Sequence, residues 1–285
     1  MNPPKYTFSR CIALVALCLA MSPALVLEAE AQAVRLNPGF ATNTLPRNDD
    51  GSTAAVPIGF TINFFGLVQN TLFVNNNGNV TFAAALGTFT PFPIQTTGVP
   101  IIAPFFADVD TRNLASGVTQ YGMDSIGGNA AFGVNWFDAN AGVGYFASHA
   151  DRLNTFQLVL IDRSDTGAGN FDFEFNYSTI QWETGDASGG SGGLGGSSAR
   201  AGYSNGSTNS FELDGSAVNG AFLDMGPNAL ISQSIGTTVL GRDLFSVRNG
   251  VVLPPPAGVP DAGSTLTLLG SSLLGLSFLR RRLAR

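Results

Sequence analysis

Apolar and polar side chains alternate one by one along several short segments of this chain, which is the repeat of a β-strand with one buried side. In residues 56–65 one face carries Ile58, Phe60, Ile62 and Phe64, and the other carries Gly59, Thr61 and Asn63. No stretch between residues 34 and 250 shows a convincing helical repeat. The sequence therefore predicts an all-β domain.

Turn signals separate the expected strands. Asn76-Asn77-Gly78 lies between the segments 72–75 and 79–82, and an Asn-Gly pair favours a tight hairpin because both residues tolerate positive φ. Later segments alternate at 132–136, 156–160 and 171–177. Short strands at regular spacing, with turns between them, predict an antiparallel sandwich or barrel-like domain with long loops.

The strand expected at residues 171–177 has two chemically different faces. Its aromatic side chains are expected in the core: Phe171, Phe173, Phe175 and Tyr177. The residues between them are expected to face water: Asp172, Glu174 and Asn176. A little further along, residues 186–198 form a Gly/Ser tract with few side chains to bury, which predicts a mobile loop.

Charge and cysteine content exclude several classes of function. Residues 34–259 carry 8 arginines against 17 carboxylates, a net charge of −9, so they lack the basic face that binding to nucleic acid requires. Both cysteines, Cys11 and Cys18, lie in the apolar N-terminal segment. We therefore expect the mature domain to have no disulfide, thiol nucleophile or thiolate metal site.

The N-terminal residues 1–33 have the three parts of an export leader. Lys5 and Arg10 precede an apolar run, and small residues follow it. Two overlapping motifs satisfy the requirement for small residues before the cleaved bond, so cleavage is expected after Ala33 or after Ala31. The bond after Ala33 is the preferred prediction, and the mature domain is then expected to span residues 34–250.

The C-terminal residues are expected to form a spacer and a sorting tail. Residues 251–258 form a stiff, proline-rich spacer. After the short motif 259–265, the apolar residues 266–279 would span about 21 Å as a transmembrane helix, and the arginine cluster 280–285 would hold its end in the cytoplasm.

The order of motif, apolar helix and arginine cluster resembles the PEP-CTERM class of bacterial sorting signals, in the variant that begins Val-Pro-Asp. The residues of the motif are Val259, Pro260, Asp261, Ala262, Gly263, Ser264 and Thr265. The Pro-Glu-Pro of the class is absent. The resemblance implies passage through the general export machinery, a transient stay in the inner membrane, and processing by an exosortase near Pro260.

Several segments between Pro38 and Val247 resemble, in order, the nidogen-like extracellular domain known as NIDO. They are IGFTINFFGLVQNTLFVNNNGNVTF (58–82), APFFADVDTRN (103–113), NTFQLVLIDRSD (154–165), FDFEFNYSTIQWETG (171–185) and ARAGYSNGSTNSFELDGS (199–216). In animal relatives this domain stands in matrix and cell-surface proteins beside disulfide-rich modules. The resemblance therefore implies a surface or matrix protein, although the partners of the animal proteins are not implied.

Asp108 and Asp110 are the candidate metal ligands. If both lie on a strand, positions i and i+2 share a face, and both carboxylates could bind an oxygen-seeking cation such as Ca²⁺. Residues 48–50 form a second acidic loop. In the alternative interpretation, Asp110 and Thr111 cap a turn and Asp108 pairs with Arg112 or another buried arginine. No other cofactor is expected.

No catalytic residue is expected. Residues 189–193 match the G-x-S-x-G pattern, but they lie inside a glycine tract without the strand and helix that a nucleophile elbow needs. His149 is the only histidine and is expected to be exposed or half-buried. Trp136, Trp182 and Tyr203 could stack on sugars, although Trp136 is expected in the core.

The sequence as a whole predicts an exported bacterial protein of the cell surface or extracellular matrix. Its expected role is adhesion to matrix components or association with exopolysaccharide in a biofilm. The alternative is a carbohydrate-binding or carbohydrate-active protein of the same matrix. An acidic pair with a raised pKa in a cleft would favour the enzyme, and a flat polar surface would favour adhesion.

Overall fold

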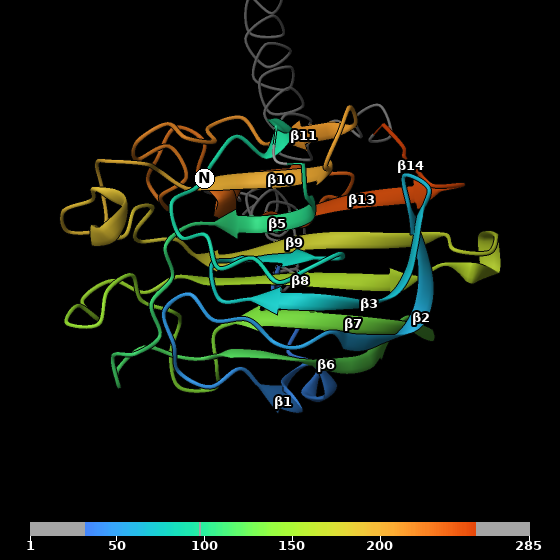
Figure 1. The fold of residues 1–285 in the computed structure, drawn as a ribbon, viewed down its shortest axis with the longest axis horizontal. Helices are drawn as coiled ribbons and strands as arrows, with labels where there is room; N and C mark the ends of the chain where they lie inside the picture. Colours follow the sequence, from blue (N-terminus) through green and yellow to red (C-terminus); the bar gives the residue numbers. More distant parts are fainter. Residues whose placement is uncertain (1–31, 97, 255–285) are drawn as a thin grey trace, which may run out of the picture. The chain divides into compact units, whose positions relative to one another are not determined.

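Two β-sheets form the domain in the computed structural model, which describes residues 32–96 and 98–254 (Figure 1). The larger sheet has eight strands in the order β1-β6-β7-β8-β9-β13-β12, with β14 also paired to β13. The smaller sheet has six strands in the order β11-β10-β5-β4-β3-β2. All pairs are antiparallel except β12 with β13. The prediction of an all-β domain is confirmed.

The strands have the following bounds. The larger sheet contains β1 (Asn43–Thr44), β6 (Thr119–Ile126), β7 (Asn129–Trp136), β8 (Thr155–Asp162), β9 (Phe171–Thr179), β12 (Ser234–Ile235), β13 (Arg242–Arg248) and β14 (Val251–Val252). The smaller sheet contains β2 (Val56–Phe64), β3 (Leu67–Asn75), β4 (Asn79–Thr81), β5 (Pro100–Phe106), β10 (Arg200–Asn205) and β11 (Ser210–Glu212). The helical turns in the described part of the chain are short 3₁₀ helices: η1 (Pro38–Ala41), η2 (Ile94–Thr96), η3 (Ser164–Thr166), η4 (Asp186–Ser188) and η5 (Leu230–Ser232).

The core lies between the two sheets, as in a sandwich. The inward side chains of β2, β3 and β5 belong to the same buried cluster as those of β7, β8 and β9. Aromatic rings join the layers: Phe105 lies 5.1 Å from Phe156, and Phe173 lies 5.5 Å from Tyr203, centroid to centroid. The alternating residues predicted to be buried in β7, β8 and β9 are all in this core.

The predicted hairpin at Asn76-Asn77-Gly78 joins β3 to β4, with Asn75 opposite Asn79. Gly78 has a φ of +73°, and a Cβ atom at this position would lie on the carbonyl oxygen of Phe105. Both the backbone conformation and the close approach of β5 therefore require glycine here. The turn also places the Asn77 side chain beside the loop that follows β5, where its Oδ1 accepts the Val109 N–H at 2.9 Å.

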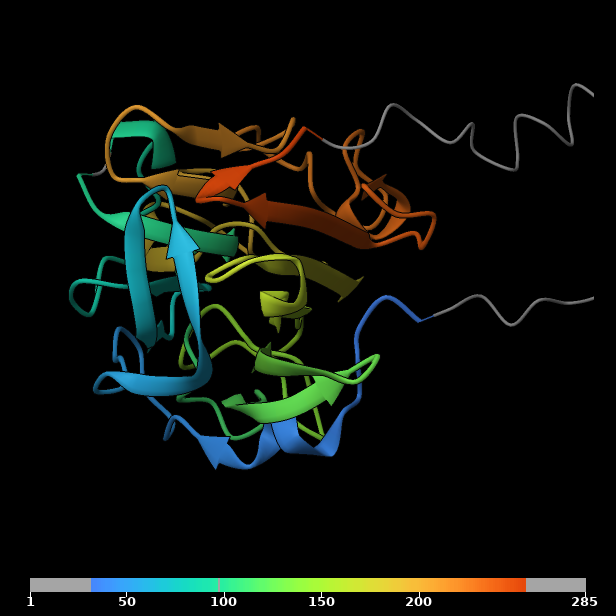
Figure 2. The same cartoon turned by 90° about the vertical axis from the view of Figure 1, so that its right-hand side faces the viewer.

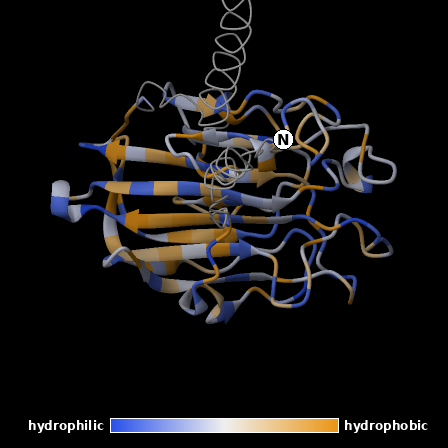
Figure 3. Cartoon of the chain, turned by 180° about the vertical axis from the view of Figure 1, so that it is seen from behind, coloured by the Kyte–Doolittle hydropathy of each residue, from blue (hydrophilic) through white to orange (hydrophobic). Residues whose placement is uncertain are grey.

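The prediction that Asp172, Glu174 and Asn176 face water is wrong, because all three are buried. They lie on the outer side of the larger sheet. Along its strands, polar and apolar residues alternate (Figure 3). The N-terminal arm, residues 32–45, crosses this outer side and bonds to Glu174 through Arg35, whereas Asp172 pairs with Arg163 and Arg248 (Figure 2). Two-residue alternation distinguishes the faces of a strand, but it does not show that a distant segment forms a third layer.

Two further predictions differ from the structure. The tract 186–198, expected to be mobile, is a folded loop whose backbone is hydrogen-bonded to itself and to residues 183–185, and its Ser188 and Ser198 are buried. The first residues of the predicted spacer, Val251–Val252, form strand β14. The predicted leader and sorting helix lie outside the described residues, within which no helix is long and apolar enough to cross a membrane.

Five long connections meet at one end of the sandwich, whereas the other end has short turns and the single long connection 82–99 between β4 and β5. The turns at 65–66, 163–170 and 249–250 are joined by backbone hydrogen bonds at the short-turn end. At the opposite end, on the left of Figure 1, hydrogen bonds and bridges connect the long loops, which are 45–55, 107–118, 137–154, 180–199 and 213–233. We call this the loop end. Binding residues concentrate on loops held by a rigid scaffold, so the loop end is where a site is expected.

Candidate functional site

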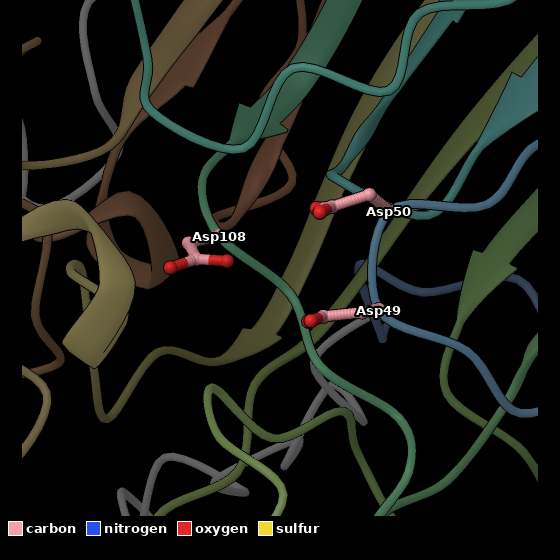
Figure 4. A group of neighbouring side chains, drawn as sticks. All are labelled: Asp49, Asp50 and Asp108. Atoms are coloured by element: carbon pink, nitrogen blue, oxygen red, sulfur yellow. The ribbon is translucent and has the colours of Figure 1, made fainter.

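Three carboxylates gather at the loop end. Asp49 and Asp50 come from the loop before β2, and Asp108 comes from the loop after β5. One oxygen of each lies within 4.8 Å of the others. Figure 4 shows the side chains of Asp49 and Asp50 pointing toward the segment that carries Asp108. We refer to these three residues as the acidic cluster.

Hydrogen bonds between the two loops hold the acidic cluster together. Asn48 and Thr111 bond to each other in both directions. The Thr111 N–H donates to the Asn48 carbonyl at 3.0 Å, and the Asn48 N–H donates to the side-chain Oγ1 of Thr111 at 2.9 Å. The Asn76 amide nitrogen donates to the carbonyls of both Asp49 and Val109. Asn77 donates to Asp50 Oδ1 at 2.9 Å. The turn Asn76-Asn77-Gly78, which we call the NNG hairpin, therefore positions both the loop that carries Asp49 and Asp50 and the loop that carries Asp108.

Asp110 does not share the position of Asp108. Strand β5 ends at Phe106, so the rule that residues i and i+2 share a face does not extend to this pair. Asp110 Oδ1 accepts the N–H of Arg112 at 2.9 Å, and its carboxylate pairs with the same guanidinium at 2.6 Å. Asp110 therefore accepts a backbone N–H two residues later, as the capping interpretation expected, whereas Thr111 Oγ1 bonds to Asn48 in the other loop. Arg112 also pairs with Asp49 at 2.8 Å.

Asp108 has a different environment from the one expected in the alternative interpretation, in which it pairs with an arginine. Among the described residues no arginine pairs with it, and its contact is the Ser188 hydroxyl at 3.4 Å. A Cβ atom on Gly185 would overlap the Asp108 carboxylate, so the backbone after β9 is packed directly against it. The expected arginine pairing of Asp108 is wrong because Arg112 turns back to Asp110, two residues away.

The electrostatics of the acidic cluster favour either protonation or a cation. Burial, reinforced by the negative charges of Asp49 and Asp50, raises the pKa of Asp108 to about 7. Burial and the charges of Asp110 and Asp50 raise the pKa of Asp49 to about 6, against the opposing effect of Arg112. A bound cation would relieve this repulsion, and carboxylate oxygens are the donors that Ca²⁺ prefers. The residues fit such a cation in charge and donor type, and the calcium site stays a prediction.

The remaining sequence candidates have structural roles. Trp136 and Trp182 are fully buried, and Tyr203 packs between phenylalanine rings, so none of the three presents a free face for stacking on a sugar. His149 is 44% exposed, as expected, and its Nε2 lies 3.4 Å from Asp186 Oδ2. Ser191 of the G-x-S-x-G match forms an isolated bridge with Leu194 within the glycine tract.

Sequence reasoning noted the acidic loop 48–50 but did not place it against Asp108. The two segments are separated by about sixty residues of sequence, and only the packing of both against the NNG hairpin brings them together. Clustered Asp and Asn residues in three separate turns are the signal that could have suggested a shared location.

Comparison with known families is consistent with this fold. The family model described as NIDO related matches residues 30–221, more than half of the chain. The chain belongs to the NIDO-related family. A second model, the VPDSG-CTERM motif, matches residues 258–283. This motif is a PEP-CTERM-like sorting signal, and it implies an exported, surface-sorted protein that an exosortase processes.

Individual relatives of this NIDO domain are large animal proteins. The chain is 34% identical over 247 residues to alpha-tectorin of Mus musculus. The match covers 78% of this chain and 11% of the relative. It is 30% identical over 141 residues to nidogen of Drosophila melanogaster, covering 41% of this chain and 10% of the relative. The chain thus spans about a tenth of the length of these relatives. No solved structure matches it significantly.

Proposed function

We propose that this NIDO-related protein is a non-enzymatic adhesion component of the cell surface or extracellular matrix, which binds exopolysaccharide or matrix components through its loop end. The observation that carries the proposal is the asymmetry of the sandwich. Five long loops meet at one end, while short hydrogen-bonded turns and the β4–β5 connection, residues 82–99, leave the sheets at the other. The sorting motif, which implies an exported and surface-sorted protein, supports a ligand outside the cell.

The loop end also carries exposed apolar side chains. Met225 is 97% exposed and Leu114 is 86% exposed, more than any other large hydrophobic residue in residues 32–96 and 98–254. Both stand on loops of the loop end. Removing such an apolar group from water on contact with a partner is favourable. Val68, at the start of β3 near the short-turn end, is 60% exposed and offers a matched control.

The test is binding of the exported protein, immobilised on beads, to extracellular polysaccharide and to an array of matrix proteins. We expect Leu114→Ser and Met225→Ser each to weaken binding about fivefold or more, since truncating a contact residue commonly costs over about 1 kcal/mol. Val68→Ser should leave binding unchanged. Equal effects at both ends, or no binding to any surface component, would contradict the proposal.

The second candidate function is a carbohydrate-active enzyme, and the acidic cluster is the observation that favours it. Asp108, with a raised pKa, could act as a general acid toward a glycosidic oxygen while a neighbouring carboxylate stays ionised. Against this, the Asp108 side chain is buried and offers little surface to a sugar chain. Release of reducing ends from matrix polysaccharide by the wild type, lost in Asp108→Asn, would establish this function instead of adhesion.

A further inference from the structure

The first described residues, Gln32–Arg35, are built into the fold. Ala33 is 8% exposed and Val34 is 3% exposed, whereas Gln32 faces solvent. The compact unit that contains both sheets begins at Gln32. These residues begin the N-terminal arm, residues 32–45, which lies along the outer side of the larger sheet (Figure 2). Ala33 is packed against Gly241, the residue before β13: a Cβ atom added to Gly241 would lie 3.1 Å from the Cβ of Ala33.

Backbone carbonyls of the arm satisfy a buried arginine. Arg242, the first residue of β13, is 8% exposed. Its Nη2 donates to the carbonyls of Gln32 at 3.0 Å and Ala33 at 2.5 Å, and its Nε donates to Asn176 Oδ1 at 3.0 Å. The carboxylate of Glu174 is 3.7 Å from Nε. Burial lowers the pKa of Arg242. A guanidinium held away from water needs hydrogen-bond acceptors in place of that water, and the arm supplies two of them.

Arg35, two residues after Ala33, is held from two sides. Arg35 N–H donates to Gln157 Oε1 at 3.0 Å, and the Gln157 amide donates back to the Arg35 carbonyl at 2.8 Å. The Arg35 guanidinium meets Glu174 at 2.6 and 2.7 Å. The path of the chain from Gln32 onward is therefore determined by side chains of β8, β9 and β13.

The two cleavage bonds predicted from the sequence differ sharply in their consequences for this arm. Cleavage after Ala33 would remove both carbonyls that Arg242 Nη2 binds. It would also create an α-ammonium group on the buried Val34, close to the guanidinium of Arg242, where desolvation and a like charge both oppose it. Cleavage after Ala31 keeps both carbonyls and places the new ammonium group on the exposed Gln32.

We propose that the export leader is removed between Ala31 and Gln32, so that Gln32 is the first residue of the mature domain and the arm from Gln32 to Arg35 completes the outer side of the larger sheet. The local sequence leaves both bonds acceptable because Ala29-Glu30-Ala31 and Ala31-Gln32-Ala33 have equally small residues at the required positions. The fold distinguishes the two bonds, because only cleavage after Ala31 keeps the two carbonyls that Arg242 binds.

The direct test is to express the full chain in a Gram-negative host, purify the exported form, and determine its first residue by N-terminal peptide mass spectrometry. The expected peptide begins at Gln32, either with a free amine or cyclised to pyroglutamate. Cyclisation joins the α-nitrogen to the side-chain carbonyl and releases ammonia. A mature chain that begins at Val34, or that retains residues before Gln32, would overturn the proposal.

A pair of full-length variants tests the structural reason. Ala29→Gln destroys the small-residue motif for the bond after Ala31 and leaves the motif for the bond after Ala33 intact. Glu30→Gln introduces the same side chain one residue later and preserves both motifs. We expect the exported Ala29→Gln product to begin at Val34 and to melt at a lower temperature than the Glu30→Gln product, which should begin at Gln32. Equal melting temperatures for products with these two different starts would show that the arm contributes nothing to the fold.

Discussion

Arg35 and Glu174 form a two-point ion pair on the outer side of the larger sheet, with Nε to Oε2 at 2.6 Å and Nη2 to Oε1 at 2.7 Å. The Glu174 side chain is 3% exposed, and that of Arg35 is 25% exposed. The pair connects residues 139 positions apart and fastens the N-terminal arm to β9. Glu174 also lies near Arg242, so this one carboxylate serves two cations.

Glu174→Ala should therefore destabilise the domain by about 3 kcal/mol, because it leaves two partly buried arginines without their shared carboxylate. Asp214, which lies exposed in the turn after β11, provides the control. Asp214→Ala should cost less than about 0.5 kcal/mol. Urea unfolding monitored by tryptophan fluorescence measures both values. Similar midpoints for the two variants would mean that the arm does not cover Glu174 in solution.

Phe173→Ala should destabilise the domain by about 3–5 kcal/mol, since it empties a fully buried aromatic position. The Phe173 ring stacks on Phe245 at 4.8 Å and meets Tyr203 from the opposite sheet, so the cavity would lie at the centre of the core. Leu114→Ala, at a residue that projects into solvent, is the matched apolar truncation and should be close to neutral. A comparable loss of stability from both would show that the strand register is misassigned.

Stability should fall as pH rises from about 4 to about 7.5 in the presence of a chelator. Asp108 and Asp243 have pKa values raised to about 7, and Asp49 to about 6, in each case chiefly by burial. The folded state therefore holds protons that the unfolded state, with a carboxyl pKa near 3.9, has already released. The stability contributed by these groups is complete below the unfolded pKa and is lost as pH rises through the folded values.

Melting temperatures at half-unit steps of pH measure this dependence. Asp243→Asn and Asp108→Asn should each flatten the slope, because an amide keeps the neutral form at every pH. If stability instead increases steadily between pH 4 and pH 7 in the wild type, the carboxylates are ionised in the folded protein and the environment described for them is incorrect.

Calcium should raise the melting temperature at pH 7.5 if the acidic cluster binds it. A ligand held only by the folded state stabilises that state by about 2.7 kcal/mol at one hundred times its dissociation constant. Asp108→Asn should abolish the response. Asp110→Asn should preserve it, because Asp110 is committed to Arg112. Identical melting curves in calcium and in EDTA would remove calcium from the description of this domain.

Deleting residues 266–285 should release the protein from the cell envelope without lowering the melting temperature of the domain. The last strand, β14, ends at Val252, and the predicted sorting helix begins fourteen residues later, beyond a proline-rich spacer. Fractionation of cells and medium, followed by a thermal melt of the released protein, provides the measurement. An insoluble or degraded truncated product would mean that the tail is required for folding.

Local sequence patterns determined much of this protein. The two-residue alternation identified the strands β2, β7, β8 and β9 with their inward aromatic residues, and Asn77-Gly78 identified the hairpin between β3 and β4. These features depend on neighbouring residues, and backbone geometry translates them directly into structure. The family and the sorting motif were also recognisable from ordered sequence segments.

Only the tertiary structure decided which polar residues are buried and which charges meet. Glu174 has the same alternating position as a solvent-facing residue, and its burial depends on an arm that begins about 140 residues earlier. Asp108 and Asp110 are equivalent by spacing, yet one joins Asp49 and Asp50 while the other binds Arg112. Electrostatic environment and solvent access arise from contacts between segments far apart in the chain, which a local pattern does not contain.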